Sequence, residues 1–143
     1  MTVAYLASTR IDAPLSFVWT HLTDARRVGR WALGSMDFQP AGPGLWRGQS
    51  LFDGSEAIVE VRPHRALGLI DYHVGTLEAR VPRVSIRAVA GGDWGQDAGC
   101  TLAAMSTWRA GWMDDARWAR TCTTHDLEVL LFKAQIETDL AAQ

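Results

Sequence analysis

Cys122 and His125 are two residues near the C-terminus whose side chains could carry chemistry. They stand three positions apart, and residues at this spacing are neighbours on a helix. An imidazole beside a thiol can generate a thiolate nucleophile. The sequence shows no third group that would orient the histidine. The pair can therefore also be a small core thiol and an imidazole that contacts a ligand headgroup, and both interpretations stay open.

His125 and Glu128 have the same helical spacing, which two ligands of a metal ion can also use. A zinc site needs three or four ligands, and the remaining donors are not evident in the sequence. Gly91 and Gly92 lead to Asp and Trp rather than into a helix, so they do not form a phosphate-binding loop. We therefore expect no metal and no cofactor.

A candidate hydroxyl, Tyr72, lies in an alternating stretch typical of a strand. Ile70, Tyr72 and Val74 form the apolar face, which we expect to point inward. Asp71 and His73 then lie on the solvated face. In this register Tyr72 can donate one hydrogen bond into an apolar cavity. In the opposite register, Asp71 and His73 would become an acid–base pair inside the protein.

The helix that must position His125 covers residues 114–143, a long stretch without Gly or Pro. Arg117 and Arg120 in its first turns are expected to face solvent. Spacings of three and four predict one stripe on a single face of the helix, made of Trp118, Cys122, His125, Val129, Phe132, Ile136 and Leu140. We expect this stripe to face the rest of the protein.

A second apolar group on the same helix consists of Leu127, Leu130, Leu131 and Ala134. A helix that lies on one sheet with solvent behind it should show only one apolar stripe. Either a second subunit covers this group, giving a homodimer through Leu127, Leu130 and Leu131, or the group itself faces the sheet. In the second case His125 turns outward.

The remainder of the chain must supply the surface on which this helix lies. Residues 3–12 alternate as a strand, and two short helices follow, the second over residues 25–33. Period-two patterns then predict further strands over residues 36–39, 45–53, 56–62, 66–75, 83–90 and 99–109. This order predicts an α+β fold in which a curved antiparallel sheet of about seven strands holds a long C-terminal helix. Mostly small side chains in the last strand predict a cavity beneath the helix.

The composition limits the class of protein. The chain of 143 residues is 48% hydrophobic and 21% charged, which suits a soluble, single domain over residues 1–143. The net charge is −2 and no basic run exceeds two arginines, so we expect no nucleic-acid partner. No apolar run is long enough for a membrane span. Two cysteines and no visible signal peptide favour a reducing, cytoplasmic location.

The seven tryptophans are numerous for this length. Trp108, Trp112 and Trp118 flank the turn into the final helix. Tryptophan brings a large apolar area with one polar N–H, so it is common in walls that contact ligands. These residues can line a pocket or its mouth, or fill the core.

The opening of the chain resembles the START-like superfamily, also called Bet v 1-like or SRPBCC, which includes polyketide cyclase/dehydrase-like and Aha1-related proteins. The matching segments are Ile11-Asp12-Ala13-Pro14, Phe17-Val18-Trp19, Leu22-Thr23-Asp24 and Trp31. The resemblance implies a helix-grip fold, with a hydrophobic pocket between the sheet and the C-terminal helix. The superfamily has no universal catalytic motif, so no catalytic residue is transferred to this chain.

These expectations favour binding of a small hydrophobic molecule of lipid, polyketide or aromatic type. The expected ligand contacts are Tyr72, Trp108, Trp118, Cys122 and His125. A second possibility is a cyclase/dehydratase-type or hydrolase-type enzyme that uses Tyr72 or His125 to transfer a proton. A third is a co-chaperone-like interaction module. The polarity of the pocket separates the first two, and an exposed apolar patch would favour the third.

Overall fold

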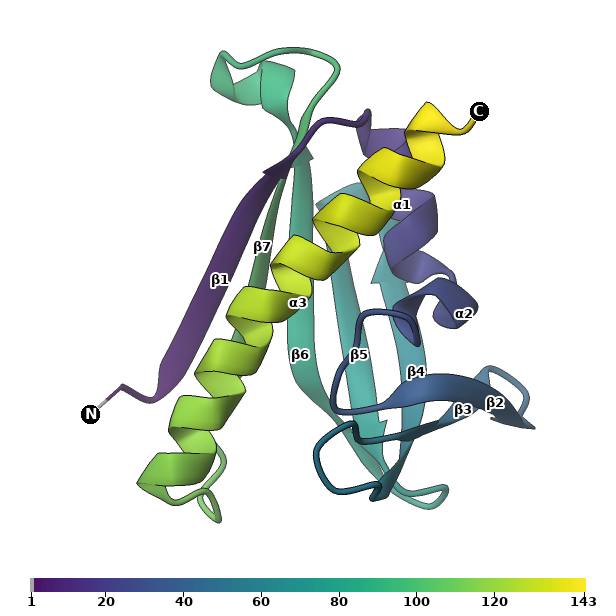
Figure 1. The fold of residues 1–143 in the computed structure, drawn as a ribbon, viewed down its shortest axis with the longest axis vertical. Helices are drawn as coiled ribbons and strands as arrows, with labels where there is room; N and C mark the ends of the chain where they lie inside the picture. Colours follow the sequence, from purple (N-terminus) through teal and green to yellow (C-terminus); the bar gives the residue numbers. More distant parts are fainter. Residues whose placement is uncertain (1) are drawn as a thin grey trace.

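A seven-stranded antiparallel sheet with the strand order β1-β7-β6-β5-β4-β3-β2 forms the frame of the protein (Figure 1). The computed structural model describes residues 2–143. The strands are β1 (Ala4–Ile11), β2 (Met36–Gly42), β3 (Leu45–Gln49), β4 (Glu56–His64), β5 (Leu69–Gly75), β6 (Arg80–Ala90) and β7 (Thr101–Trp108). The helices are α1 (Leu15–Thr23), α2 (Ala25–Val28) and α3 (Asp115–Ala141), with short 3-10 turns η1 (Arg65–Leu67) and η2 (Gly91–Trp94).

The long helix α3 crosses one face of this sheet, and α1 lies beside its C-terminal half (Figure 1). The α+β helix-grip architecture predicted from the sequence is therefore confirmed. Within residues 2–143, none of the helices is both long and apolar enough to cross a membrane. The sheet curls because its strands twist, and this leaves α3 at different depths along its length.

The faces of β5 follow the predicted alternation. Ile70 and Tyr72 are buried beneath the helices. Asp71 lies on the opposite face, where it accepts a hydrogen bond of 2.6 Å from the Ser85 hydroxyl on β6. The Asp71 carboxylate also lies 3.5 Å from the His64 ring. The prediction that Asp71 belongs to the outer face is confirmed, so it forms no acid–base pair inside the protein.

The second helix is shorter than the sequence suggested. It was expected over residues 25–33 and ends at Val28. Beyond this point the chain continues through tight turns, in which the Trp31 amide donates to the Val28 carbonyl at 3.1 Å. A side chain at Gly29 would lie 3.0 Å from the Phe38 ring, so glycine here lets β2 pack close to the turn. Helical periodicity alone does not reveal this long-range constraint.

Several strand boundaries also differ from the expected ones, and two of them are the end of β3 and the start of β6. The strand expected over residues 45–53 ends at Gln49. After it, the Leu51 amide donates to the Leu33 carbonyl at 2.9 Å, so the chain bonds to the loop before β2 instead of continuing the sheet. At the other end, β6 begins at Arg80 rather than at residue 83. The early end of β3 creates a loop over residues 50–55 that lies against the loop preceding β2.

The predicted stripe of α3 faces the sheet. Its buried members are Trp118, His125, Val129, Phe132 and Ile136. Leu127 and Leu130, from the second apolar group, are 49% and 58% exposed. The alternative in which this second group faces the sheet and His125 turns outward is therefore wrong. Leu131 is partly buried against the edge of the core.

Candidate functional site

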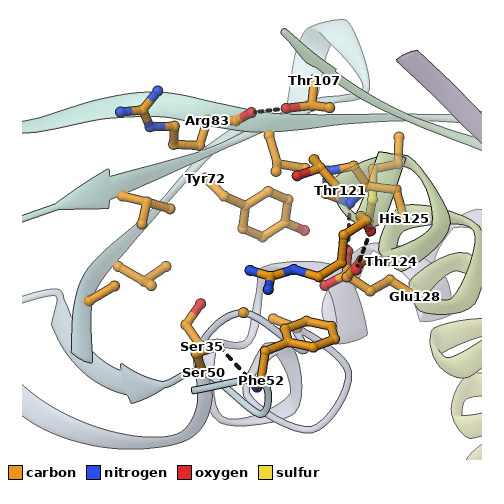
Figure 2. Close-up of a pocket in the computed structure, with 18 of the residues that line it drawn as sticks. Ser35, Ser50, Phe52, Tyr72, Arg83, Thr107, Thr121, Thr124, His125 and Glu128 are labelled. Atoms are coloured by element: carbon orange, nitrogen blue, oxygen red, sulfur yellow. Dashed lines mark hydrogen bonds and ion pairs between the residues drawn. The ribbon is translucent and has the colours of Figure 1, made fainter. Parts of the chain in front are cut away.

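A cavity of about 310 Å³ lies between the first half of α3 and the inner face of the sheet. Loops over residues 32–35 and 50–55 close one side of it, and Figure 2 shows Ser35, Ser50 and Phe52 there. The apolar part of its wall includes Trp31, Val59, Tyr72, Val74, Val84 and Met105. Thr107, one of the small residues of the last strand, also lines it, in agreement with the predicted unfilled space under the helix.

The polar centre of this cavity is the pair His125 and Glu128. The imidazole Nδ1 lies 2.6 Å from Glu128 Oε1, and both side chains are buried. Glu128 Oε2 accepts a second hydrogen bond, of 2.9 Å, from the Leu33 amide. Each carboxylate oxygen therefore has one partner, which compensates for the cost of burying a charged group. Since a carboxylate can only accept, Nδ1–H donates when Glu128 is ionised.

The second ring nitrogen of His125, Nε2, has no hydrogen-bond partner among residues 2–143. Every fully enclosed side-chain nitrogen or oxygen in the described chain does have a partner. Nε2 is therefore not fully enclosed, and because His125 lines the cavity, it is accessible from that side. A histidine whose Nδ1 is fixed by a carboxylate presents Nε2 in a defined orientation, as a hydrogen-bonding group or as a base.

Tyr72 lines the cavity with its ring, but its hydroxyl is already engaged. The hydroxyl donates a hydrogen bond of 2.7 Å to the Leu22 carbonyl, near the end of α1. Carbonyls in the last turn of a helix lack a partner within the helix, so Tyr72 satisfies one of them. Burial, and then the nearby Glu128 carboxylate, raise the pKa of Tyr72 well above its ordinary value. Tyr72 therefore stays neutral, and its proton is directed at α1 instead of into the cavity.

The loop before β2 is held in place by contacts from two directions. Glu128 on α3 binds the amide of Leu33, and β3 supports the loop from below through Gly48. A Cβ at position 48 would lie 2.7 Å from the Ser35 Cβ, so only glycine allows this close approach. The loop thus brings Ser35 to the rim of the cavity.

The mouth of the cavity combines aromatic and cationic side chains. Trp108 and Trp112, which are 70% and 61% exposed, line it together with Phe52. Three arginines from α3 and β6 also line it: Arg83, Arg117 and Arg120. The sequence predicts only that the two arginines of α3 face solvent. They are exposed, but they border the cavity.

Of the five predicted contacts, the structure brings Tyr72, Trp108 and His125 together around the cavity. Trp118 is buried beyond its edge, and its indole N–H donates to the Thr2 hydroxyl at 3.2 Å. Cys122 is half-buried and does not belong to the lining. Of the predicted contacts, Tyr72, Trp108 and His125 are therefore the ones that a ligand in the cavity would meet.

The thiolate hypothesis for Cys122 has no geometric support. Burial, and then the neighbouring Asp126 carboxylate, raise the pKa of the Cys122 thiol. The Nδ1 atom of His125 is engaged by Glu128 instead of the thiol. Among residues 2–143, no group of three His, Cys, Asp or Glu side chains is arranged to hold a metal ion. The spacing of His125 and Glu128 instead produces a hydrogen-bonded pair.

Comparisons with known proteins identify the fold but not a family. No family model matches the chain, and no curated protein matches it. Among solved structures, the Aha1 dimer from Colwellia psychrerythraea has a TM-score of 0.67 at 15% identity, over 95% of this chain and 97% of that one. The ZhuI aromatase/cyclase from Streptomyces sp. R1128 has a TM-score of 0.64 at 16% identity, over 96% and 94% of the two chains.

DynU16, a protein from the dynemicin biosynthetic locus, has a TM-score of 0.65 at 18% identity over 97% of this chain. The alignment covers 49% of DynU16, so the present chain spans about half of that protein. At these identities the likeness concerns the backbone, and functional residues are not transferable. The chain shares the fold of these structures, a curved antiparallel sheet around a long C-terminal helix, which the resemblance of its opening segments implied.

Proposed function

We propose that this protein binds a small hydrophobic molecule, of lipid, polyketide or aromatic type, in the cavity beneath α3. The observation that supports this is a cavity of about 310 Å³ with an apolar wall and one oriented polar pair, His125 and Glu128. Ligand sites in proteins are typically concave, mostly apolar and equipped with few polar groups. In this proposal Tyr72 and Trp108 supply apolar contact, and His125 Nε2 supplies the polar one.

The binding proposal is tested by titrating the protein with N-phenyl-1-naphthylamine, an uncharged aromatic dye that fluoresces in apolar surroundings. We expect saturable binding, and loss of it when the cavity is filled by Ala57→Phe. Ala66→Phe introduces the same ring at an exposed turn and serves as the control. Circular dichroism of both variants verifies the fold. Absence of saturable binding to the folded wild-type protein would refute the proposal.

A second candidate function, proton transfer to or from the bound molecule, is favoured by the orientation of His125. Its Nδ1 is fixed by Glu128 and its Nε2 is accessible from an apolar cavity, an arrangement that suits a general base. The cyclase/dehydratase alternative requires such a base. Since the Tyr72 hydroxyl is bound to Leu22, this role belongs to His125.

The probe reaction for this function is ring opening of 5-nitrobenzisoxazole. Nε2 would take the ring C–H proton while the N–O bond breaks, and the product is a coloured phenolate. We expect His125→Ala to abolish the protein-dependent rate and Glu128→Gln to lower it. His64→Ala removes a surface histidine that also faces a carboxylate, Asp71 at 3.5 Å, and should leave the rate unchanged. A rate that survives His125→Ala would refute the base assignment.

We also propose a homodimer through the outer side of α3, where Leu127 and Leu130 are exposed and Leu131 lies partly buried beside them. One protein of the same fold, the Aha1 protein of Colwellia psychrerythraea, has been described as a dimer. This exposed group is the feature on α3 that a co-chaperone-like interaction module would also use.

Two unbridged cysteines, Cys100 and Cys122, support our proposal of a cytoplasmic location.

A further inference from the structure

Arg83, Arg117 and Arg120 line the cavity mouth, and none of them makes an ion pair with any residue in the range 2–143. One acidic residue lines the cavity with them, Glu128, and it is already bonded to His125 and to the Leu33 amide. The lining is therefore positive in a protein whose net charge is −2.

Three acids near these arginines have other hydrogen-bond or ion-pair partners, although the charge of Arg120 also acts on Asp53. The Ser55 hydrogen bonds, and to a smaller extent Arg120, lower the pKa of the Asp53 carboxyl. Asp114 caps the start of α3 by accepting from the Arg117 amide at 2.7 Å. Asp115 pairs at 2.9 Å with Arg109, which lies outside the cavity. Asp53, in the loop beside the cavity, accepts hydrogen bonds from the Ser55 hydroxyl and amide at 2.7 and 2.9 Å.

Aromatic rings, instead of carboxylates, hold the three guanidinium groups. The guanidinium carbons of Arg117 and Arg83 lie 5.3 and 5.9 Å from the centre of the Trp112 ring. That of Arg120 lies 4.7 Å from the centre of the Phe52 ring. Stacking on a ring orients a guanidinium but leaves its N–H groups available to bind an anion.

The positions of two of these arginines are unfavourable without an anion. Arg117 is the third residue of α3, so it lies in the first turn, at the positive end of the helix dipole. Cations are disfavoured at this end of a helix and anions are favoured. Arg83 and Arg117, which both stack on the Trp112 ring, also repel each other. An anion bound between the ring-stacked guanidinium groups would relieve both effects.

We propose that the ligand is amphiphilic, with an apolar body inside the cavity and one anionic group, a carboxylate, sulfonate or phosphate, at the mouth. Arg117 and Arg120 bind the anionic group, and Arg83 adds positive charge from the strand side. This inference rests on the proposed binding function and adds the charge of the ligand to it. Guanidinium groups suit planar or tetrahedral oxyanions because they donate two parallel hydrogen bonds.

The test uses two dyes with one aromatic skeleton. N-phenyl-1-naphthylamine is neutral, and 1-anilinonaphthalene-8-sulfonate carries an added sulfonate. We expect the wild-type protein to bind the sulfonate at least roughly tenfold more tightly than the neutral dye, because charge-assisted hydrogen bonds to the guanidinium groups add to apolar burial. The preference should decrease as salt rises, while the affinity for the neutral dye stays constant.

The double variant Arg117→Gln/Arg120→Gln should lose most of this preference and keep its affinity for the neutral dye. Arg117→Lys/Arg120→Lys, which retains the charges, should retain part of it. The control is Arg26→Gln/Arg65→Gln, because these arginines also stack on tryptophans, at 5.9 Å from Trp46 and 5.1 Å from Trp19, but lie outside the cavity lining. The control should bind both dyes as the wild type does.

Displacement of the sulfonate dye by 1-naphthoate, 1-naphthyl phosphate and 1-naphthalenemethanol separates the anion classes. The anion that displaces the dye at the lower concentration identifies the preferred anionic group. The alcohol should require the highest concentration. Equal displacement by all three, or equal wild-type affinity for the two dyes at low salt, would overturn the anion proposal and leave hydrophobic binding intact. If neither dye binds saturably, the proposed binding function itself fails, and the anion proposal fails with it.

Discussion

Two histidine–carboxylate pairs lie along α3, and the pairs differ in one respect. Near the C-terminal end, His21 of α1 uses both ring nitrogens: Nδ1 lies 3.0 Å from the Phe17 carbonyl and Nε2 lies 3.0 Å from Asp139. Near the middle of the helix, His125 uses only Nδ1, bonded to Glu128 at 2.6 Å. The first histidine is fully engaged in joining two helices, whereas the second retains a nitrogen for a ligand.

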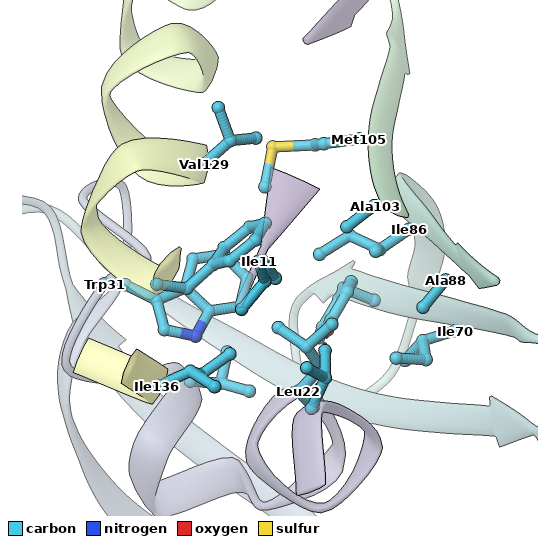
Figure 3. Packing of buried hydrophobic residues seen from close by; sticks show 14 of the residues in the cluster. Ile11, Leu22, Trp31, Ile70, Ile86, Ala88, Ala103, Met105, Val129 and Ile136 are labelled. Carbon is cyan, nitrogen blue, oxygen red and sulfur yellow. Dashed lines mark hydrogen bonds between the residues drawn. The ribbon is translucent and has the colours of Figure 1, made fainter. Parts of the chain in front are cut away.

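The packing around the two pairs also differs, since the core is filled near His21 and a cavity remains near His125. At the core end, α3 contributes Phe132 and Ile136, which are essentially fully buried, and the Phe132 ring lies 5.2 Å from that of Trp31. Figure 3 shows Ile136 and Val129 of α3 meeting side chains from α1 and the sheet. At the cavity end, the helix contributes Thr121 and Thr124, which are too small to fill the space. The side of α3 that faces the sheet thus fills a core in one half of the helix and leaves a cavity in the other, because of the sizes of its side chains.

Phe132→Ala should have the largest effect on stability, because it removes a ring from the filled end. We expect a loss of about 3–5 kcal/mol in the free energy of unfolding, measured by urea denaturation. Leu130→Ala on the exposed side of the same helix is the control, expected within about 0.5 kcal/mol of the wild type when both proteins are measured as monomers. A loss below about 1 kcal/mol for Phe132→Ala would remove the contrast between a packed end and a hollow one.

Replacement by alanine should affect mainly the stability of the protein at His21 and mainly its ligand binding at His125. His21→Ala should lower the free energy of unfolding by about 1–3 kcal/mol, because it removes buried hydrogen bonds between α1 and α3. His125→Ala should cost less, since water from the cavity can reach Glu128, but should weaken binding of N-phenyl-1-naphthylamine by roughly three- to tenfold. Unchanged dye affinity in His125→Ala would exclude this residue from the site.

Tyr72→Phe tests the hydrogen bond between the Tyr72 hydroxyl on β5 and the Leu22 carbonyl on α1. Loss of the hydroxyl leaves the Leu22 carbonyl without its partner, so we expect a cost of about 1–2 kcal/mol in the free energy of unfolding near pH 7. The raised pKa of Tyr72 also predicts a pH effect. The unfolded state ionises at the ordinary pKa of about 10 while the folded state stays neutral, so stability falls as pH rises above that value.

As pH rises from about 10 to 11, Tyr72→Phe should therefore lose less stability than the wild type. The difference between their free energies of unfolding should become smaller. Urea denaturation at several pH values measures it. A constant difference across this range would show that the hydroxyl of Tyr72 titrates alike in the folded and unfolded states.

Leu127→Gln/Leu130→Gln should have the smallest effect on folding and tests the outer side of α3. Both side chains are exposed, so the free energy of unfolding should change by no more than about 0.5 kcal/mol, measured for the monomer. Sedimentation should show a dimer for the wild type and a monomer for the variant, because burial of the leucines between subunits would be lost. A monomeric wild type at all accessible concentrations would contradict the proposed dimer.

Local periodicity was sufficient to predict much of this structure. The spacing of Trp118, Val129 and Phe132 predicted the buried side of α3, and the alternation around Tyr72 predicted the inner face of β5. These patterns reflect geometry within a single element, with periods of about 3.6 residues for a helix and two for a strand. The cavity under the helix followed from the small side chains of the last strand.

The composition of the site was less predictable, because it depends on contacts between distant segments. The sequence indicates Glu128 only as a residue at metal-ligand spacing from His125. Its hydrogen bond to the Leu33 amide joins residues 95 positions apart, and local spacing does not reveal it. Arg117 and Arg120 give no sign in the sequence that they border a cavity with Phe52 and Trp112. The engaged hydroxyl of Tyr72 was likewise hidden, because its acceptor is a backbone carbonyl and backbone carbonyls have no sequence signature.

The bond between Glu128 and the Leu33 amide has a spectroscopic consequence. This N–H points at one carboxylate oxygen while the other oxygen holds the ring of His125. A change in the charge or position of that carboxylate must alter the shielding of the amide proton and its rate of exchange with deuterium. The Leu33 resonance in a ¹H–¹⁵N spectrum is therefore a built-in reporter, from which occupancy of the cavity can be followed without any label on the ligand.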